Sequence, residues 1–110
     1  MLKQNRERIV PSSGNVFADM GLLDAEELDT KVRLGAALCR IIEERGLTQA
    51  QIGTTLGINQ PKVSALLNYK LEGFSIERLM RFLVALGHDV EISIKAGPRS
   101  RSARIAVKAA

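Results

Sequence analysis

The residues best suited to chemistry lie between Leu47 and Asn68, in the stretch LTQAQIGTTLGINQPKVSALLN, which contains no aspartate or glutamate. The amide groups of Gln49 and Gln60 can donate hydrogen bonds to phosphate or read an adenine edge, and Lys62 adds a full positive charge. An acidic side chain here would be repelled by phosphate. The segment is therefore predicted to be approached by a nucleic acid.

Catalysis and metal binding find no support in the sequence. The chain has a single cysteine, which excludes an internal disulfide, and its lone His88 leaves too few ligands for a metal site. No glycine-rich phosphate loop is present. Glu26 and Glu27 are interpreted as partners of a helix dipole and not as an acid–base pair. We predict a protein that is not an enzyme and needs no cofactor.

The net charge of +4 is concentrated at the C-terminus. Residues 96–110 contain four basic side chains and no acid, so the rest of the chain is neutral overall. Five acids and no base lie in 19–29, well away from the segment without acids. Such asymmetry is compatible with phosphate binding and equally with an ordinary solvated surface.

The chain divides into three parts. Residues 1–14 are predicted to be a flexible arm, with a short extended piece at Arg8–Val10, and residues 96–110 a disordered basic tail that either adds phosphate contacts or only aids solubility. One domain, 15–95, remains. Neither a signal peptide nor a run of about 18 apolar residues is found, so we expect a cytoplasmic protein without a membrane span.

The first predicted helix begins at Asp24, which can form a capping box with Glu27, and ends at Gly46 after Arg45. Leu23 and Leu28 occupy the two positions of a hydrophobic staple. The predicted core stripe of this first helix contains Leu28, Val32, Gly35, Cys39 and Ile42, widened by Leu34, Leu38 and Ile41. The cysteine is interpreted as a small buried hydrophobe.

Two short helices follow, separated by a turn around Gly57. Thr48 can cap a helix over Gln49–Leu56, and Asn59 can cap the next helix, with Pro61 in its first turn. Two short helices joined by three or four residues around a glycine are typical of a helix-turn-helix. The fold class predicted for 15–95 is therefore mainly α, a compact lambda-repressor-like helical bundle that binds DNA.

The third helix is predicted to bury Val63, Leu66 and Leu67, because they share one side at 100° per residue. A slim exposed face can enter a major groove, where serine and asparagine bond to base edges or phosphate and alanine meets a thymine methyl group. The outward face contains Pro61, Ser64, Ala65 and Asn68, with Lys62 and Tyr69 at the flank and Lys70 just beyond.

A fourth helix is predicted after Ser75, with Gly87 closing it and a core stripe of Ile76, Leu79, Met80, Leu83 and Leu86. The segment HDVEISIK then alternates between apolar and polar residues, which predicts a strand with Val90, Ile92 and Ile94 on one face. A lone strand needs a partner. Either the Arg8–Val10 arm or, as we favour, the same strand of a second subunit supplies it, giving a homodimer suited to palindromic DNA.

The stretch LTQAQIGTTLGINQPKVSALLN resembles the helix-turn-helix of the Cro/repressor (XRE) superfamily. With SSGNVFADMGLLDAEE and LEGFSIERLMRFLVALGHDVEI, it resembles the HigA-like antitoxins within that superfamily, over about residues 12–95. The resemblance implies that Asn59, Gln60 and Lys62 contact bases and that Gln49 and Asn68 contact the DNA backbone. Pro61 stands where many relatives carry a polar side chain, so one base contact is lost.

The resemblance also implies a biological role. HigA-like antitoxins repress their own operon and neutralise a RelE-like ribonuclease toxin, so a toxin is an expected protein partner beside double-stranded DNA. The acids of 19–29 are candidates for its docking site, since a ribonuclease that approaches RNA presents basic surfaces. Two alternatives stay open: a stand-alone repressor without a toxin, and a module that contacts protein or RNA.

Overall fold

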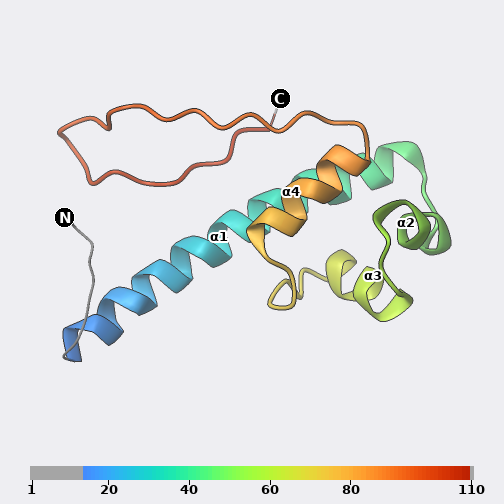
Figure 1. Ribbon diagram of the computed structural model, residues 1–110, viewed down its shortest axis with the longest axis horizontal. Helices are drawn as coiled ribbons and strands as arrows, with labels where there is room; N and C mark the ends of the chain where they lie inside the picture. Colours follow the sequence, from blue (N-terminus) through green and yellow to red (C-terminus); the bar gives the residue numbers. More distant parts are fainter. Residues whose placement is uncertain (1–13, 110) are drawn as a thin grey trace.

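The computed structural model describes residues 14–109, and their side chains from Ala25 onward. Four helices form in this part of the chain: α1 (Gly14–Arg45), α2 (Gln49–Leu56), α3 (Gln60–Leu67) and α4 (Ile76–Ala85) (Figure 1). Because the described residues form helices and no strand, the predicted mainly helical fold is confirmed. The arm at 1–13, including Arg8–Val10, lies outside the described residues.

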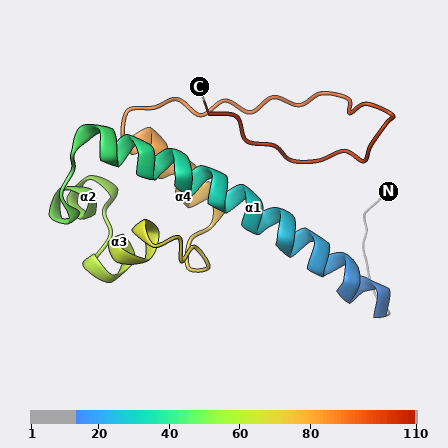
Figure 2. The same cartoon turned by 180° about the vertical axis from the view of Figure 1, so that it is seen from behind.

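Helix α1 is longer than predicted, and the expected start at Asp24 is wrong. The helix already runs from Gly14 and continues through Asp24 to Arg45, over 32 residues. A capping signal only permits a start, and no proline lies between Gly14 and Asp24; the isolated Gly21 weakens a helix without ending it. Glu27 instead pairs with Lys31 one turn later, at 3.3 Å. The N-terminal half of α1 therefore projects beyond the other helices (Figures 1 and 2).

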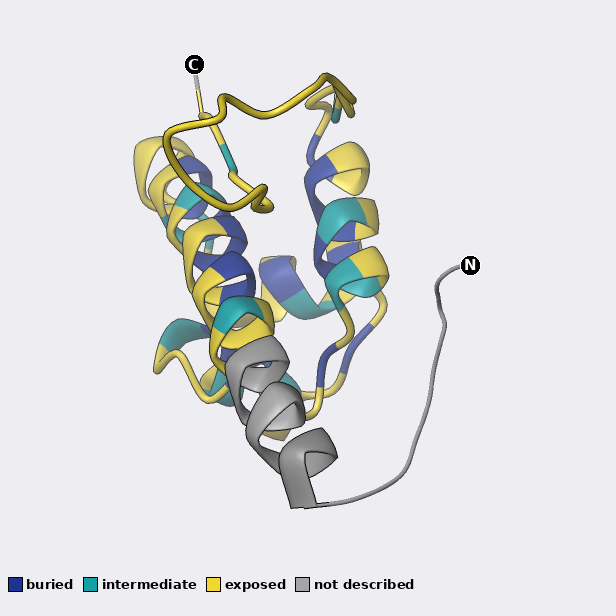
Figure 3. Ribbon diagram, turned by 90° about the vertical axis from the view of Figure 1, so that its left-hand side faces the viewer, coloured by how far each residue is buried: buried dark blue, intermediate teal, exposed yellow. Residues whose placement is uncertain are grey.

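The core lies between the C-terminal half of α1 and the three shorter helices. Leu38 of α1 is completely buried, as are Val63 and Leu66 of α3 and Leu79 of α4. Figure 3 shows these buried faces turned toward one another. The rest of the apolar core contains Leu34, Ile41, Ile42, Ile52, Leu56, Ile58, Leu71, Phe74, Phe82, Leu83 and Leu86. All four helices contribute to this core, which is aliphatic except for Phe74 and Phe82.

Part of the predicted core stripe of α1 is exposed. Leu28 and Val32 remain 51% and 39% accessible, so their expected place in the core is wrong. Helical periodicity identifies an apolar stripe but not the point at which neighbouring helices cease to cover it. The rest of the predicted stripe lies against the neighbouring helices: Gly35 and Ile42 are buried, as are Leu34, Leu38 and Ile41, and Cys39 is half-buried.

The predicted helix caps of the shorter helices are confirmed. Thr48 accepts a hydrogen bond from the backbone N–H of Gln51, whose side chain accepts from the backbone N–H of Thr48 in return, forming a capping box. Asn59 caps α3 and Ser75 caps α4 in the same way through their side-chain oxygens. Gly57 ends α2 with φ of 69°, a left-handed conformation that a glycine adopts without strain.

Replacing Thr48 with alanine is expected to lower the free energy of unfolding by about 1 kcal/mol, because the backbone N–H of Gln51 loses its acceptor, the hydroxyl of Thr48. The backbone N–H of residue 48 keeps its bond to the Gln51 side chain. Chemical denaturation followed by circular dichroism measures the change. Thr55→Ala, at an exposed position of the same helix, is the matched control and should leave stability nearly unchanged. Equal effects of the two substitutions would show that the cap does not stabilise α2.

The strand predicted at 89–95 is not formed. Residues 88–98 have no regular secondary structure, and Ile92 and Ile94 are 74% and 93% exposed. Only Val90 packs partly against the core. Alternation of apolar residues indicates the tendency to form a strand, but a strand requires a hydrogen-bonding partner, and none pairs with this segment among the described residues.

Beyond this segment the chain turns at 99–101 and returns along α1. The backbone N–H of Ile105 donates to the carboxylate of Glu26 at 3.2 Å, and Val107 packs partly against the core. Figures 1 and 2 show this excursion, residues 88–109, on the side of α1 opposite to α2 and α3. None of the described helices is long and apolar enough to cross a membrane.

Candidate nucleic-acid interface

Helix α3 presents a narrow polar face to solvent. Gln60, Pro61, Ser64 and Asn68 are exposed, while Val63 and Leu66 on the opposite side are fully buried. Ala65, predicted on the outward face, is instead half-buried and packs against the core. The exposed face therefore consists of short and uncharged side chains, which allow a helix to approach the floor of a groove closely.

The turn between α2 and α3 depends on a close contact that the sequence analysis missed. A Cβ atom at Gly53 would lie 2.9 Å from the carbonyl oxygen of Ile58 and 3.6 Å from Val63. The backbone N–H of Ile58 donates to the carbonyl of Gly53 at 3.0 Å. The glycine thus allows α2 and α3 to approach each other. A glycine in the middle of a short helix, where glycine is unfavourable, was the sequence signal for this close contact.

Two predicted contact residues are already engaged in local hydrogen bonds. The Oδ1 atom of Asn59 accepts from the backbone N–H of Lys62 at 3.0 Å, so its side-chain amide is the donor that a ligand would meet. The Nδ2 group of Asn68 donates to the carbonyl of Ser64 at 2.8 Å. The same Nδ2 group donates to the hydroxyl oxygen of Ser64 at 3.4 Å, so the Oδ1 atom of Asn68 and the hydroxyl proton of Ser64 are what these two exposed residues can offer to a ligand.

Lys62 does not extend along the exposed face of α3. Its side chain is half-buried, and its Nζ atom lies 5.3 Å from the centre of the Phe74 ring. The same nitrogen is 3.6 Å from the position of a Cβ atom on Gly73. Lys62 is therefore directed toward the loop that precedes α4, where a phosphate is a more accessible partner than a base edge.

The other two predicted contact residues are exposed. Gln49 occupies the first position of α2, and Lys70 follows the C-terminal end of α3, where its backbone N–H donates to the carbonyl of Ala65 at 2.8 Å. Between them α2 and α3 contain no acidic side chain. The structure thus brings Gln49, Asn59, Gln60, Lys62, Ser64, Asn68 and Lys70 onto or beside the helix-turn-helix.

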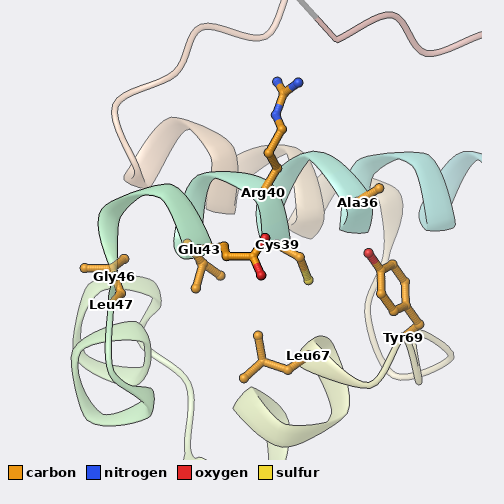
Figure 4. Close-up of a pocket in the computed structure, with 9 residues that line it drawn as sticks. Ala36, Cys39, Arg40, Glu43, Gly46, Leu47, Leu67 and Tyr69 are labelled. Carbon is orange, nitrogen blue, oxygen red and sulfur yellow. The ribbon is translucent and has the colours of Figure 1, made fainter.

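Cys39 and Tyr69 face a shallow hollow of about 670 Å³ between α1 and the end of α3 (Figure 4). Burial raises the pKa of the Cys39 thiol, and the nearby charge of Glu43 adds to the effect, while a hydrogen bond with Tyr69 opposes it. A raised pKa keeps the sulfur as an unreactive thiol at neutral pH. Tyr69 adopts φ of 58° as the chain leaves α3. The described residues include no metal-binding cluster of three acidic, histidine or cysteine side chains.

Two short capped helices are joined by a tight glycine turn, and the second of them has a slim polar face. These features define a helix-turn-helix protein. A family profile described as a helix-turn-helix domain matches residues 16–95. The chain belongs to this helix-turn-helix family and, by its likeness to a solved structure, to the XRE family of DNA-binding transcriptional regulators.

That solved structure is described as an XRE family transcriptional regulator. It shares 62% sequence identity with the chain and a TM-score of 0.76, and the match covers 79% of this chain and 99% of the other. A search of curated proteins found no match. The family confirms the superfamily predicted from the sequence, and it is one of DNA-binding regulators and not of enzymes.

Proposed function

We propose that the protein regulates transcription in the cytoplasm by reading a specific DNA sequence with α3 in the major groove. The observation that carries the proposal is the exposed face of α3, which is slim, uncharged and rich in hydrogen-bonding groups. A helix built only to cover a core would more often present long lysine and glutamate side chains to water.

Residues at the start and centre of α3 are assigned to the bases. Gln60 can bond to an adenine with both atoms of its amide, and Asn59 contributes its remaining amide donor. Ser64 and Asn68 present a hydroxyl and a carbonyl oxygen one turn further along. Ala65 is half-buried, so only the exposed part of its side chain can contact the methyl group of a thymine.

Phosphate contacts are assigned to residues around this face. Gln49 lies at the start of α2, and Lys62 and Lys70 lie beside α3. A titration of the DNA upstream of the gene, with unrelated duplex as competitor at fixed salt, tests the function. We expect a preference of about a thousandfold or more for the upstream DNA. Equal affinity for both duplexes would exclude sequence-specific regulation.

We further propose that two copies assemble through residues 88–95 and read a palindromic operator. Support comes from Ile92 and Ile94, which are highly exposed on an extended segment whose backbone groups can pair with a second copy. Val90 stays partly packed against the core and would anchor that segment to its own domain. A two-fold dimer places two copies of α3 about one helical turn of DNA apart.

Ile92→Lys is expected to shift the assembly toward monomers at micromolar concentration, because an unpaired charge would be buried in the interface. Sedimentation velocity measures the shift. Ile105→Lys, at another exposed isoleucine of the same excursion, is the matched control and should leave the assembly intact. A dimer that persists in Ile92→Lys would place the interface elsewhere, and a monomeric wild type would refute this assembly.

The finer role that we propose is that of a HigA-like antitoxin, whose partner is a RelE-like toxin. The motivating feature is the projecting N-terminal half of α1, which contains the acid-rich sequence of 19–29. Two of these acids are locally engaged, since Asp29 pairs with Arg33 at 2.9 Å and Glu27 with Lys31. Glu26 is engaged as well, since it accepts a hydrogen bond from the backbone N–H of Ile105, but the side chain of Glu26 is only partly buried and that of Asp29 is exposed, so a partner can reach both carboxylates. The side chains of Asp19 and Asp24 lie outside the described part.

Replacing Glu26 and Asp29 together with lysine is expected to reduce capture of the protein encoded next to the gene by about tenfold and to leave DNA binding unchanged. Co-purification of the two expressed proteins and a DNA titration with the same sample measure both properties. Undiminished capture at low and moderate salt would remove these acids from the interface. Absence of capture by the wild-type chain would leave a stand-alone repressor.

A further inference from the structure

The loop from α3 to α4 folds back on the start of α3. It leaves the C-terminal end of α3 at Tyr69, yet its Phe74 ring lies 5.3 Å from the Nζ atom of Lys62, in the first turn of that helix. The ring is 2% exposed and contacts Phe82 edge-on, with centroids 5.8 Å apart. Two aromatic rings from the loop and α4 thus form a rigid apolar support beside the DNA-reading helix.

A second cation lies on the same support. The guanidinium carbon of Arg78 is 5.7 Å from the centre of Phe74 and 5.6 Å from that of Phe82. Arg78 is half-buried at the third position of α4, where its backbone N–H donates to the Ser75 cap. Lys62 and Arg78, which are distant in sequence, therefore bring two positive charges to one pair of rings.

Neither cation is neutralised by an acidic side chain in an ion pair within the described part of the chain. The acid nearest to Arg78 in sequence, Glu77, pairs with Arg81 at 2.9 Å instead. Contact with an aromatic face holds a cation without cancelling its charge, and restricting the side chain reduces the entropy lost when it binds. Two such cations beside a helix that enters the major groove suit the phosphates that border the groove.

We infer that Arg78, supported by Phe74 and Phe82, contacts a phosphate of the DNA bound on α3, and that Phe74 is a positioning residue for Arg78 and Lys62. This inference rests on the proposed reading of DNA by α3 and adds two residues to it. A phosphate contact carries no sequence information, so it strengthens binding to specific and nonspecific duplex alike.

The test compares the salt dependence of binding for Arg78→Gln and Arg81→Gln, using the upstream DNA and an unrelated duplex. Loss of one phosphate contact makes the negative slope of log K against log salt less steep by about 0.9, equivalent to about an eightfold weaker binding at 0.1 M salt. We expect this change for Arg78→Gln with both duplexes. Arg81→Gln alters the charge equally, at an exposed side chain one turn after Arg78 that pairs with Glu77, and should keep the wild-type slope.

Two substitutions of Phe74 separate positioning from folding. Phe74→Leu removes the aromatic face and should make the salt dependence of binding less steep, under conditions in which circular dichroism shows a folded chain. Phe74→Tyr retains the ring and should keep the salt dependence of the wild type. If Phe74→Leu unfolds the chain, the comparison of Arg78→Gln with Arg81→Gln and the salt dependence of Phe74→Tyr still test the inference. Equal slopes for Arg78→Gln and the wild type would overturn the inference alone. A wild-type chain that binds neither duplex would overturn the proposed function and this inference with it.

Discussion

Leu38→Ala is expected to lower the free energy of unfolding by about 2–5 kcal/mol, the largest effect of any single change considered for this chain. Leu38 is fully buried in α1, in the core shared with the three shorter helices. Removing its side chain leaves a cavity that the surrounding aliphatic residues fill only in part. Urea denaturation monitored by circular dichroism measures the loss of stability, and α3 should unfold together with α1 in a single transition.

Leu28→Ala provides the matched control, because it makes the same chemical change in the same helix at a residue that is 51% exposed. Its cost should stay near 0.5 kcal/mol or below. A cost for Leu28→Ala as large as that for Leu38→Ala would contradict the core described here and would show that the projecting part of α1 is covered in solution.

The second large effect concerns DNA. Lys62→Glu is expected to weaken binding to the upstream DNA by about 1–3 kcal/mol, because it replaces a cation beside the phosphates with an anion that they repel. The helix should persist, since the α3 cap depends on the backbone N–H of residue 62 and not on its side chain. Fluorescence anisotropy at constant salt measures the affinity, and circular dichroism verifies the fold.

Lys95→Glu is the matched control for charge. Lys95 is exposed and belongs to residues 88–109, a segment that Figure 1 shows on the side of α1 opposite to α3. The same change in net charge there should leave affinity almost unaltered. Equal weakening by both substitutions would mean that net charge, and not contact with the helix-turn-helix, governs binding. An unweakened Lys62→Glu variant would remove Lys62 from the interface.

Local signals predicted the short helices well. Thr48, Asn59 and Ser75 were expected to cap helices, and each accepts the backbone N–H that a capping residue should accept. These bonds form within a few residues of the cap, so they depend little on the rest of the fold. The burial of Val63 and Leu66 followed from helical periodicity for the same reason.

Features that depend on distant residues were not predictable in this way. Whether Leu28 is covered depends on how far α2–α4 extend along α1, and the place of Lys62 depends on Phe74, which a loop returns to it. Whether 89–95 forms a strand depends on a pairing partner. Helix α1 began before Asp24 because a capping sequence competes with continued helix and does not interrupt it.

The central claim, that α3 reads bases, is tested most directly by selecting bound sequences from a random duplex pool with the wild-type chain and with Gln60→Ala. The account predicts that the wild type enriches one sequence, and that Gln60→Ala enriches the same sequence with the preference lost at the base pair that Gln60 contacts. Enrichment of no common sequence by the wild type, or an identical preference at every position for the two proteins, would contradict it.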